Sequence, residues 1–481
     1  MKSVRKINVT IEEKSMKKIK TTLLVSLASV GLLATSCGGG GGETDFQPIE
    51  DDKKYNIEFF GWGSAEEQSN FSKIVNEFNQ SQDKIHVSYS ATDSNSYMTT
   101  LKNRANNLPD VFYMPDYNFM EWAQSNRLMR LDGDFAGAIT DQDLSGIWEL
   151  SHKMYRYDRN TFKLGEGALY GLPKDLGPYT LVYNKTMLNE IIANSGGALA
   201  LPSSEDPMTF DEFRDYLLKI KQYKVGTPYE NVYGVSHYEI MPAVYSNGSD
   251  FYKDNNRHSN LDDPRVSEAI QWITDLSLVD GTMPTASMQT ATNGYQRFLS
   301  KGCVFTFMGP WDLKAYWEQV DFEFDVIPVA KGNHEDCVST AWVGSVAYSI
   351  SNTSRNKAAA LEFVKYLSLS ESSSRMNYQL GQAMPNIVEM AENDWLQNVG
   401  ITDERKKLPE HKEVFVNITK GTEKMRGKNR AAYFCPSSLP YDNLLDKLSP
   451  VWTGEKTAAE HFASYHNTFE HDLDEAYQYF E

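Results

Sequence analysis

Apolar residues near the start of the folded region alternate between two periodicities, and this alternation restricts the chain to few architectures. Residues 55–60 and 85–89 have the pattern of strands, whereas Phe71, Ile74 and Phe78 recur between them at helical spacing. The next predicted elements are a helix, a strand and a helix, at residues 96–107, 111–114 and 118–128. This β-α-β-α-β order predicts a parallel sheet with right-handed crossovers and helices on both faces.

The middle of the chain repeats the alternation. Thr209 and Glu212 form a capping box at the start of one helix, and residues 263–264 (Asp-Pro) begin another. Strands are predicted at 179–183 and 303–308. Because 481 residues also exceed what a single core usually supports, we expect a second α/β lobe.

The N-terminal segment predicts export. Lysines precede the apolar run 23–34, and small residues follow it, which is typical of a signal peptide over 1–36. The run is shorter than the roughly 20 residues that a membrane-spanning helix needs. Ala34-Thr35-Ser36-Cys37 resembles a bacterial lipobox with Ala34 in the usual Leu position, so we expect lipidation of Cys37 and a flexible tether over 37–53. Soluble secretion is the alternative.

Charge and composition exclude several classes of partner. The formal net charge is −18, and the predicted signal peptide carries mostly positive charges, so the mature chain is more acidic still. A nucleic acid would be repelled rather than bound through counterion release. Hydrophobic residues make up 41% of the chain and aromatic residues 12%, enough for a large core. We expect a folded protein without a nucleic-acid partner.

The sequence offers little support for a metal site or for catalysis. Cys303, Cys337 and Cys435 lack CxxC or Cys/His spacing, which argues against zinc, and they allow one disulfide whose pairing stays open. GxSxG, HExxH and GxxxxGK[ST] motifs are missing from the sequence. We therefore assign no catalytic residue, metal or cofactor.

Two tryptophans follow or end predicted strands. Trp311 lies just after the apolar run 303–308, in Gly309-Pro310-Trp311, and Trp342 lies in Trp342-Val343-Gly344-Ser345. In open α/β sheets the ligand crevice lies beyond the carboxyl ends of the strands, so these indoles are candidate stacking platforms. Packing within the core is the alternative for each ring.

Several motifs, taken in order, resemble the extracellular solute-binding proteins of family 1, the maltose-binding-protein-like subunits of carbohydrate transporters. The matching segments are Pro109-Asp110-Val111 with 123–131, 171–173 with 183–185, 298–302 with 309–311, 342–345 with 350–367, and Gly381-Gln382-Ala383-Met384-Pro385. The resemblance implies a periplasmic-binding-protein-like fold, with two doubly wound α/β lobes, a three-segment hinge and a ligand cleft between the lobes. The implied lobes comprise 54–178 with 329–382 and 179–328 with 383–481.

The resemblance also suggests which residues bind the ligand. A sugar presents C–H faces to aromatic rings and hydroxyls to carboxylates and amides. The expected ligand-binding residues are Trp62, Glu67, Asp116, Asp175, Tyr179, Asn247, Trp311 and Trp342. For each of them, core packing, turn capping or simple solvation is the alternative.

By this resemblance the protein is a monomeric substrate-binding lipoprotein of an ABC transporter, anchored on the extracytoplasmic side of the cell membrane. It captures a carbohydrate, we expect an oligosaccharide, by hinge closure and delivers it to the permease subunits. Two alternatives stay open. One is a secreted carbohydrate-active enzyme, and the other is the same fold binding a polyamine or a peptide.

Overall fold

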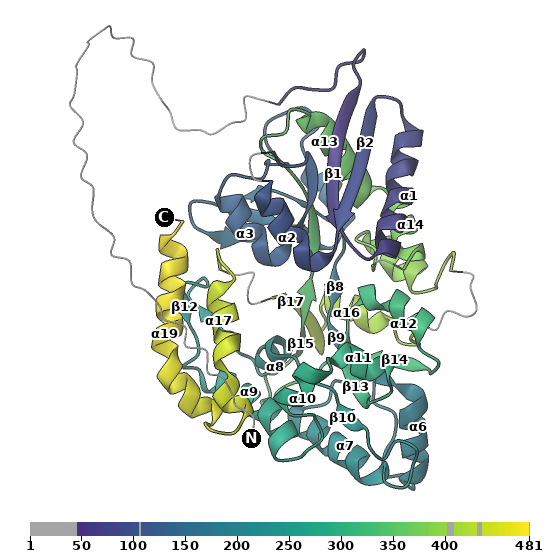
Figure 1. Cartoon of the computed structure of the whole chain (residues 1–481), viewed down its shortest axis with the longest axis vertical. Coiled ribbons are helices and arrows are strands. Elements are labelled where there is room, and N and C mark those ends of the chain that lie inside the picture. The colour runs from purple at the N-terminus through teal and green to yellow at the C-terminus, as the bar shows by residue number, and fades with distance from the viewer. Residues whose placement is uncertain (1–45, 105–106, 382, 402–407, 431–434, 481) are drawn as a thin grey trace, which may run out of the picture. The chain divides into compact units, whose positions relative to one another are not determined.

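The computed structural model describes residues 46–104, 107–381, 383–401, 408–430 and 435–480, and residues 43–481 form one compact unit (Figure 1). The predicted signal peptide, Cys37 and most of the predicted tether lie outside the described residues. Within the described part, no helix combines the length and the apolar content needed to cross a bilayer.

The first sheet has the order β2-β1-β3-β16-β7. Strands β1 (Tyr55–Trp62), β2 (Ile85–Thr92) and β3 (Val111–Pro115) run parallel, as the β-α-β-α-β pattern predicts. Strand β16 (Val346–Ile350) runs antiparallel to β3, and β7 (Leu172–Pro173) pairs antiparallel with β16, so β7 points in the same direction as β1–β3. The sheet is therefore mixed rather than wholly parallel, because β16 runs against its neighbours.

Helices α1 (Ala65–Ser81), α2 (Ser94–Asn103), α3 (Asp116–Gln124), α13 (Lys357–Leu369) and α14 (Glu371–Gln379) surround this sheet (Figure 1). The helices predicted at 96–107 and 118–128 both begin and end earlier than the periodicity suggested. In α2 the start is set by a side-chain cap at the preceding aspartate, which accepts a backbone hydrogen bond from the first turn.

The second sheet has the order β10-β13-β9-β14. It contains β10 (Tyr233–Val235), β13 (Cys303–Met308), β9 (Thr180–Asn184) and β14 (Phe324–Ile327). Strands β10 and β13 are parallel, whereas β9 is antiparallel to both of its neighbours. Every residue of β9, β13 and β14 is buried, which explains their continuous apolar runs.

A third sheet, called here the crossover sheet, consists of β8 (Gly177–Pro178), β15 (Ser339–Gly344) and β17 (Met425–Asn429) in the order β17-β15-β8. Strand β8 lies in the chain between β7 of the first sheet and β9 of the second, and β15 lies between β14 and β16. The chain thus passes between the two larger sheets through the crossover sheet, as Figure 1 shows.

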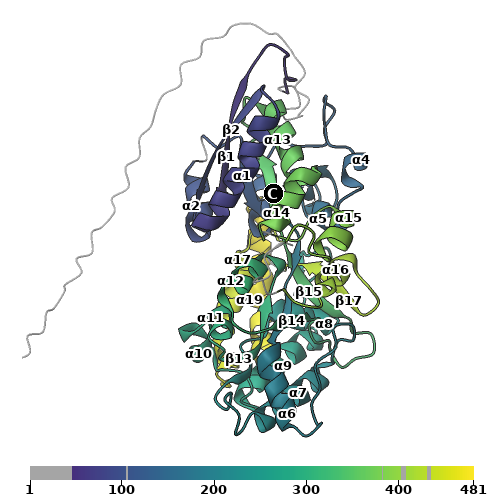
Figure 2. The same cartoon turned by 90° about the vertical axis from the view of Figure 1, so that its right-hand side faces the viewer.

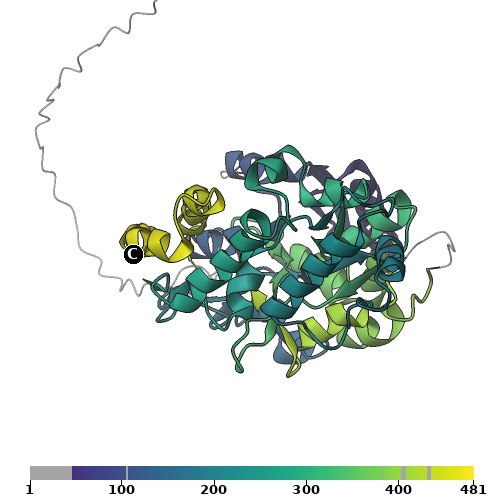
Figure 3. The same ribbon diagram turned by 90° about the horizontal axis from the view of Figure 1, so that it is seen from below.

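The C-terminal helices α17 (Leu439–Lys447), α18 (Ser449–Trp452) and α19 (Ala458–Gln478) pack beside α9 (Pro264–Leu278) and β12 (His258–Ser259). They are the yellow helices in Figures 1 and 3, and Figure 2 shows α17 and α19 from the side.

The remaining elements connect these layers. They are α4 (Asp141–Leu144), α5 (Glu149–Lys153), β4 (Arg156–Asp158), β5 (Lys163–Leu164), β6 (Ala168–Leu169), α6 (Lys185–Asn194), α7 (Phe210–Tyr223), α8 (Ile240–Ser246), β11 (Tyr252–Lys253), α10 (Ala286–Ala291), α11 (Gly294–Leu299), η2 (Pro310–Asp312), α12 (Leu313–Gln319), α15 (Val388–Met390), η3 (Ala391–Trp395) and α16 (Glu413–Lys420).

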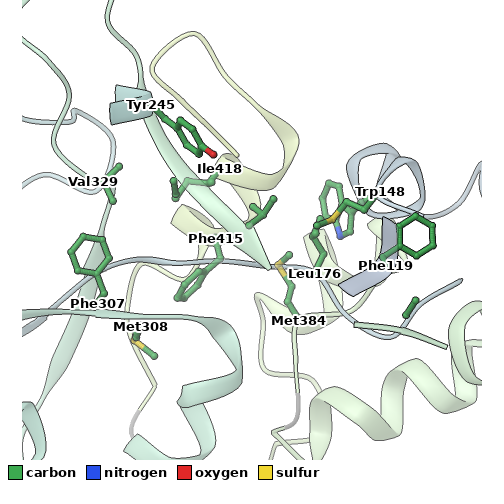
Figure 4. Packing of buried hydrophobic residues seen from close by; sticks show 14 of the residues in the cluster. Phe119, Trp148, Leu176, Tyr245, Phe307, Met308, Val329, Met384, Phe415 and Ile418 are labelled. Carbon is green, nitrogen blue, oxygen red and sulfur yellow. The ribbon is translucent and has the colours of Figure 1, made fainter. Parts of the chain in front are cut away.

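The buried apolar residues form one continuous cluster. Figure 4 shows its middle part, where Phe307 and Met308 of β13, Phe415 and Ile418 of α16, and Leu176 before β8 are all buried. The core therefore continues from the second sheet past the crossover sheet. Cys303, Cys337 and Cys435 are buried in the folded chain as free thiols, so the disulfide that their number allowed is not formed.

Candidate functional site

Three of the predicted ligand-binding residues come together in one stacked group, called here the aromatic row: Tyr179, Trp311 and Trp342. The Tyr179 ring lies 4.6 Å from that of Trp342 and 5.9 Å from that of Trp311, and the two indoles are 6.1 Å apart. Their planes differ by only 5–29°. All three residues are half-buried, so the row is neither sealed in the core nor freely solvated.

The rings of the aromatic row come from three separate chain segments. Tyr179 lies between β8 and β9, Trp311 lies in η2 just after β13, and Trp342 lies in β15. A Cβ atom added at Gly177 would lie 2.3 Å from the Trp311 ring, so glycine is required there for the indole to reach the row. The crossover sheet thus supplies part of the row itself, and the second sheet supplies the remainder.

Carboxylates lie next to the row. The Trp342 Nε1 atom donates to Glu239 Oε2 at 3.3 Å, and the other oxygen of Glu239 lies 3.2 Å from His237 Nε2. Burial raises the pKa of Tyr179 well above its usual value, and the nearby carboxylates of Glu239 and Asp312 add to the rise. The Tyr179 hydroxyl therefore stays neutral and can both donate and accept hydrogen bonds.

Asp116 is buried, with 1% of its surface exposed, at the start of α3. Arg430 donates from Nε to Asp116 Oδ2 at 2.9 Å and pairs through Nη2 with the second oxygen, Oδ1. The same guanidinium carbon lies 5.3 Å from the centre of the Trp342 ring and 5.1 Å from that of Tyr117. Asp116 therefore lies close to the aromatic row, and its carboxylate is engaged by an arginine.

A second group, called here the Trp62 cluster, lies at the ends of β1 and β3. Trp62 packs edge-on against Tyr97 and Tyr113, with ring centres 4.7 and 5.0 Å away. Only 1% of Tyr113 is exposed, and its hydroxyl has no hydrogen-bond partner among the described residues. Several other buried tyrosine hydroxyls share this property, among them those of Tyr155 and Tyr316, so it does not by itself identify a ligand position.

Asp175 lies beside the Trp62 cluster and joins two chain segments. Lys174 donates to Asp175 Oδ2 at 2.6 Å, and the backbone N–H of Val346 donates to Oδ1 at 3.2 Å. The Lys174 ammonium also lies 5.8 Å from the centre of the Tyr113 ring. The predicted role of Asp175 as a hydroxyl acceptor would thus be shared with a structural one.

Glu67 faces the region after β13 from α1. Its carboxylate accepts from the N–H of Ser64 at 2.6 Å in a capping box, so capping accounts for one of its oxygens. Burial raises the pKa of Asp312 to about 7, and the nearby Glu67 carboxylate contributes to the rise. Lys314 of α12 forms an ion pair with Glu66 at 2.7 Å. The first turn of α1 is therefore close to η2 and α12.

Asn247 is the predicted residue that the structure sets apart from this arrangement. It is 2% exposed at the end of α8. Its Nδ2 atom donates to the Arg265 carbonyl at 2.8 Å and to Glu268 Oε2 at 3.2 Å. These contacts give it a structural role in joining α8 to α9.

Three important residues escaped the sequence analysis: Glu239, Asp312 and Arg430. Asp312 directly follows Trp311, so the sequence alone shows that Asp312 lies near the Trp311 ring. Arg430 reaches Trp342 through the pairing of β17 with β15, in which Trp342 is opposite Lys428. The local sequence does not predict the pairing of β17 with β15.

Asp325, Glu410 and His411 form a separate group with ligand atoms within 4.8 Å of one another. Lys185 Nζ lies 2.5 Å from Glu410 and 3.8 Å from Asp325. This ammonium supplies the positive charge that the carboxylates need, and the group is best described as an ion-pair network.

Sheets linked by a crossover sheet that carries half-buried aromatic rings define a class of protein, the two-lobed solute-binding fold. A family model of bacterial extracellular solute-binding proteins matches residues 62–373, more than half of the chain. The chain belongs to this family of solute-binding proteins.

Solved structures share the fold at low sequence identity. An ABC substrate-binding protein from Listeria monocytogenes, in complex with cycloalternan, has a TM-score of 0.68 and 16% identity, with 88% of this chain and 100% of that chain covered. The cyclic alpha-maltosyl-1,6-maltose binding protein of Arthrobacter globiformis has a TM-score of 0.67 and 18% identity, with 89% and 99% covered. The GacH receptor of Streptomyces glaucescens, solved unliganded and with acarbose, gives 0.66 and 19%, with 88% and 99% covered. Among curated proteins, none matches by sequence.

Proposed function

We propose that this protein is the substrate-binding component of an ABC transporter and that its solute is a carbohydrate, specifically an oligosaccharide. The observation that carries the proposal is the aromatic row with carboxylates at its edge. A pyranose has apolar C–H patches on its faces, which stack on rings, and hydroxyls on its rim, which donate to carboxylates. The row and Glu239 offer both kinds of contact side by side.

The ligands of the structural neighbours support the same class. The three neighbours described above were solved with cycloalternan or acarbose, or bear the name of a cyclic maltose derivative. These ligands are larger than a single sugar unit. The three ring centres of the aromatic row lie within 6.1 Å of one another, so the proposal of an oligosaccharide rests on these ligands.

Capture would occur by closure of two lobes, with 54–178 and 329–382 in one and 179–328 and 383–481 in the other. The predicted ligand contacts come from both, since Trp62 and Glu67 belong to the first and Trp311 to the second. A ligand that touches both lobes stabilises the closed form over the open one, and closure is the signal that a permease can recognise. We further propose a monomer that is anchored by a lipid on Cys37 and faces the extracytoplasmic side.

The test begins with a thermal-shift screen of neutral oligosaccharides, because a ligand that binds only the folded state raises the melting temperature. Titration calorimetry then compares the wild type with Trp311→Ala, and with Trp452→Ala in α18 as a control tryptophan. We expect 1:1 binding that Trp311→Ala weakens at least tenfold and Trp452→Ala leaves unchanged.

Two results would contradict the proposal. Conversion of the oligosaccharide into products would indicate an enzyme. Binding of polyamines or peptides, with no heat from any glycan and no effect of Trp311→Ala, would move the solute to another class.

A further inference from the structure

Arg430 connects three parts of the molecule that the proposed function requires to act together. Its guanidinium pairs with buried Asp116 at the start of α3, beside the first sheet. It also lies over Trp342, which belongs to the middle strand of the crossover sheet. Arg430 itself directly follows β17, an outer strand of that sheet.

The register of the crossover sheet explains this placement. Trp342 pairs with Lys428 across β15 and β17, and residues two apart on a strand point to the same face. Arg430 lies two residues beyond Lys428, just after the end of β17, and its guanidinium carbon lies 5.3 Å from the centre of the Trp342 ring. Lys428 turns instead toward Tyr245, with its ammonium 4.5 Å from the ring centre, and pairs with Asp250. Lys428 and Arg430 thus contact different partners.

Arginine suits this position better than lysine. A guanidinium is planar, so it can bind both oxygens of Asp116 with one edge while its flat faces lie against aromatic rings. Here the rings of Tyr117 and Trp342 lie at similar distances, 5.1 and 5.3 Å. The Trp342 indole is consequently held by Arg430, by Tyr179 at 4.6 Å and by the Nε1 hydrogen bond to Glu239.

We propose that Arg430 is a positioning residue: it holds the Trp342 ring in the orientation that stacks on the solute and ties that ring to the start of α3 through Asp116. The inference rests on the proposed sugar-binding function of the aromatic row. It changes the role predicted for Asp116, whose carboxylate acts through Arg430 instead of accepting hydroxyls from the solute.

The test uses Arg430→Lys, which keeps the charge but loses the planar, two-pronged contact. The matched control is Arg265→Lys, away from the aromatic row. Arg265 also binds both oxygens of an aspartate, since it donates to Asp336 at 2.9 and 3.0 Å. The first readout needs no ligand. The near-ultraviolet circular dichroism of Trp342 is identified as the signal lost in Trp342→Phe, and we expect Arg430→Lys to lose at least half of it.

The second readout is calorimetric affinity for neutral tetrasaccharides of the malto, cello and xylo series. Arg430→Lys should weaken the binding of the tightest one at least fivefold, whereas Arg265→Lys should change neither affinity nor spectrum. The double variant Asp116→Asn/Arg430→Gln removes both charges and should regain the thermal stability that Arg430→Gln alone loses, without regaining the Trp342 signal.

An unchanged Trp342 signal in Arg430→Lys would overturn the inference, as would full recovery of that signal in the double variant. If wild-type protein binds none of these tetrasaccharides, the sugar proposal fails, and the ligand-free spectrum still decides whether Arg430 positions Trp342.

Discussion

Gly177 offers the sharpest test of how the aromatic row is built. An added Cβ would lie 2.3 Å from Cζ3 of Trp311, 2.7 Å from Cε3 and 3.0 Å from Cδ of Pro310. Carbon atoms in favourable contact are about 3.5–4.0 Å apart, so Gly177→Ala must move the indole by more than about 1 Å. The backbone at Gly177 is not in the left-handed region, so alanine brings no conformational strain there. The substitution therefore acts through the contact alone.

The magnitude follows from two contributions. Overpacking of this size costs about 1–3 kcal/mol of stability, and a stacked aromatic pair such as Tyr179–Trp311 is worth about 0.5–1.5 kcal/mol. A platform displaced by about 1 Å loses about a quarter to a half of its contact energy with a sugar. Half of a contact worth about 1.5 kcal/mol is about 0.7 kcal/mol, so we expect Gly177→Ala to weaken oligosaccharide binding about threefold.

Titration calorimetry measures the affinity, and near-ultraviolet circular dichroism reports the ring packing. Gly146→Ala is the control, because a Cβ there would meet nothing within 4 Å. An affinity and a spectrum of Gly177→Ala that both equal those of Gly146→Ala would refute the reasoning, since the indole would then not rest on the backbone of β8.

Three further predictions concern charge. Desolvation raises the pKa of Asp312 to about 7 from its ordinary value of 3.8, so the folded state keeps a proton that the unfolded chain releases. The free energy of unfolding should therefore fall as pH rises from about 4 to 7, and Asp312→Asn should lack that slope in urea unfolding. Desolvation lowers the pKa of Lys412 to about 7 from 10.5, so between these values the unfolded chain holds the extra proton. The free energy of unfolding should therefore rise from about pH 7 to 10, and Lys412→Met should flatten this rise in urea unfolding. An equal pH dependence in the variant would contradict this burial effect. Lys174 and Arg430 are each paired with a carboxylate, while Glu67 and Glu239 add negative charge near the proposed site. A neutral tetrasaccharide should therefore bind at least tenfold more tightly than its uronate counterpart in calorimetry at low salt. Equal affinities would show that the carboxylates do not face the solute.

Local pattern was sufficient for much of the fold. The strands at 55–60, 85–89 and 111–114 were identified by apolar runs and alternation, and their parallel order followed from the helices between them. The predicted capping box at Thr209 begins a real helix, because the Glu212 side chain accepts a hydrogen bond from the backbone N–H of Thr209. The antiparallel pairing of β16 with β3 and β7 was not predicted, since these strands are remote from one another in the chain.

The candidate site likewise contains residues that the local sequence predicts and residues that it does not. Trp311 was predictable because Gly-Pro-Trp follows a buried strand, which places the ring beyond the strand end. The contacts of Glu239 and Arg430 with Trp342 depend on pairings between segments about 100 residues apart, which sequence periodicity does not reveal. Asn247 illustrates the converse, since a polar residue beside a glycine can serve an internal joint between helices.

Trp342 belongs to the middle strand of the crossover sheet. The ring that is proposed to stack on the solute is therefore also part of the proposed hinge. A substitution of this ring would therefore be expected to change both the selectivity for the solute and the ease of lobe closure. For the same reason, indole emission could report bending directly, which would make the unlabelled protein an optical sensor of its own occupancy.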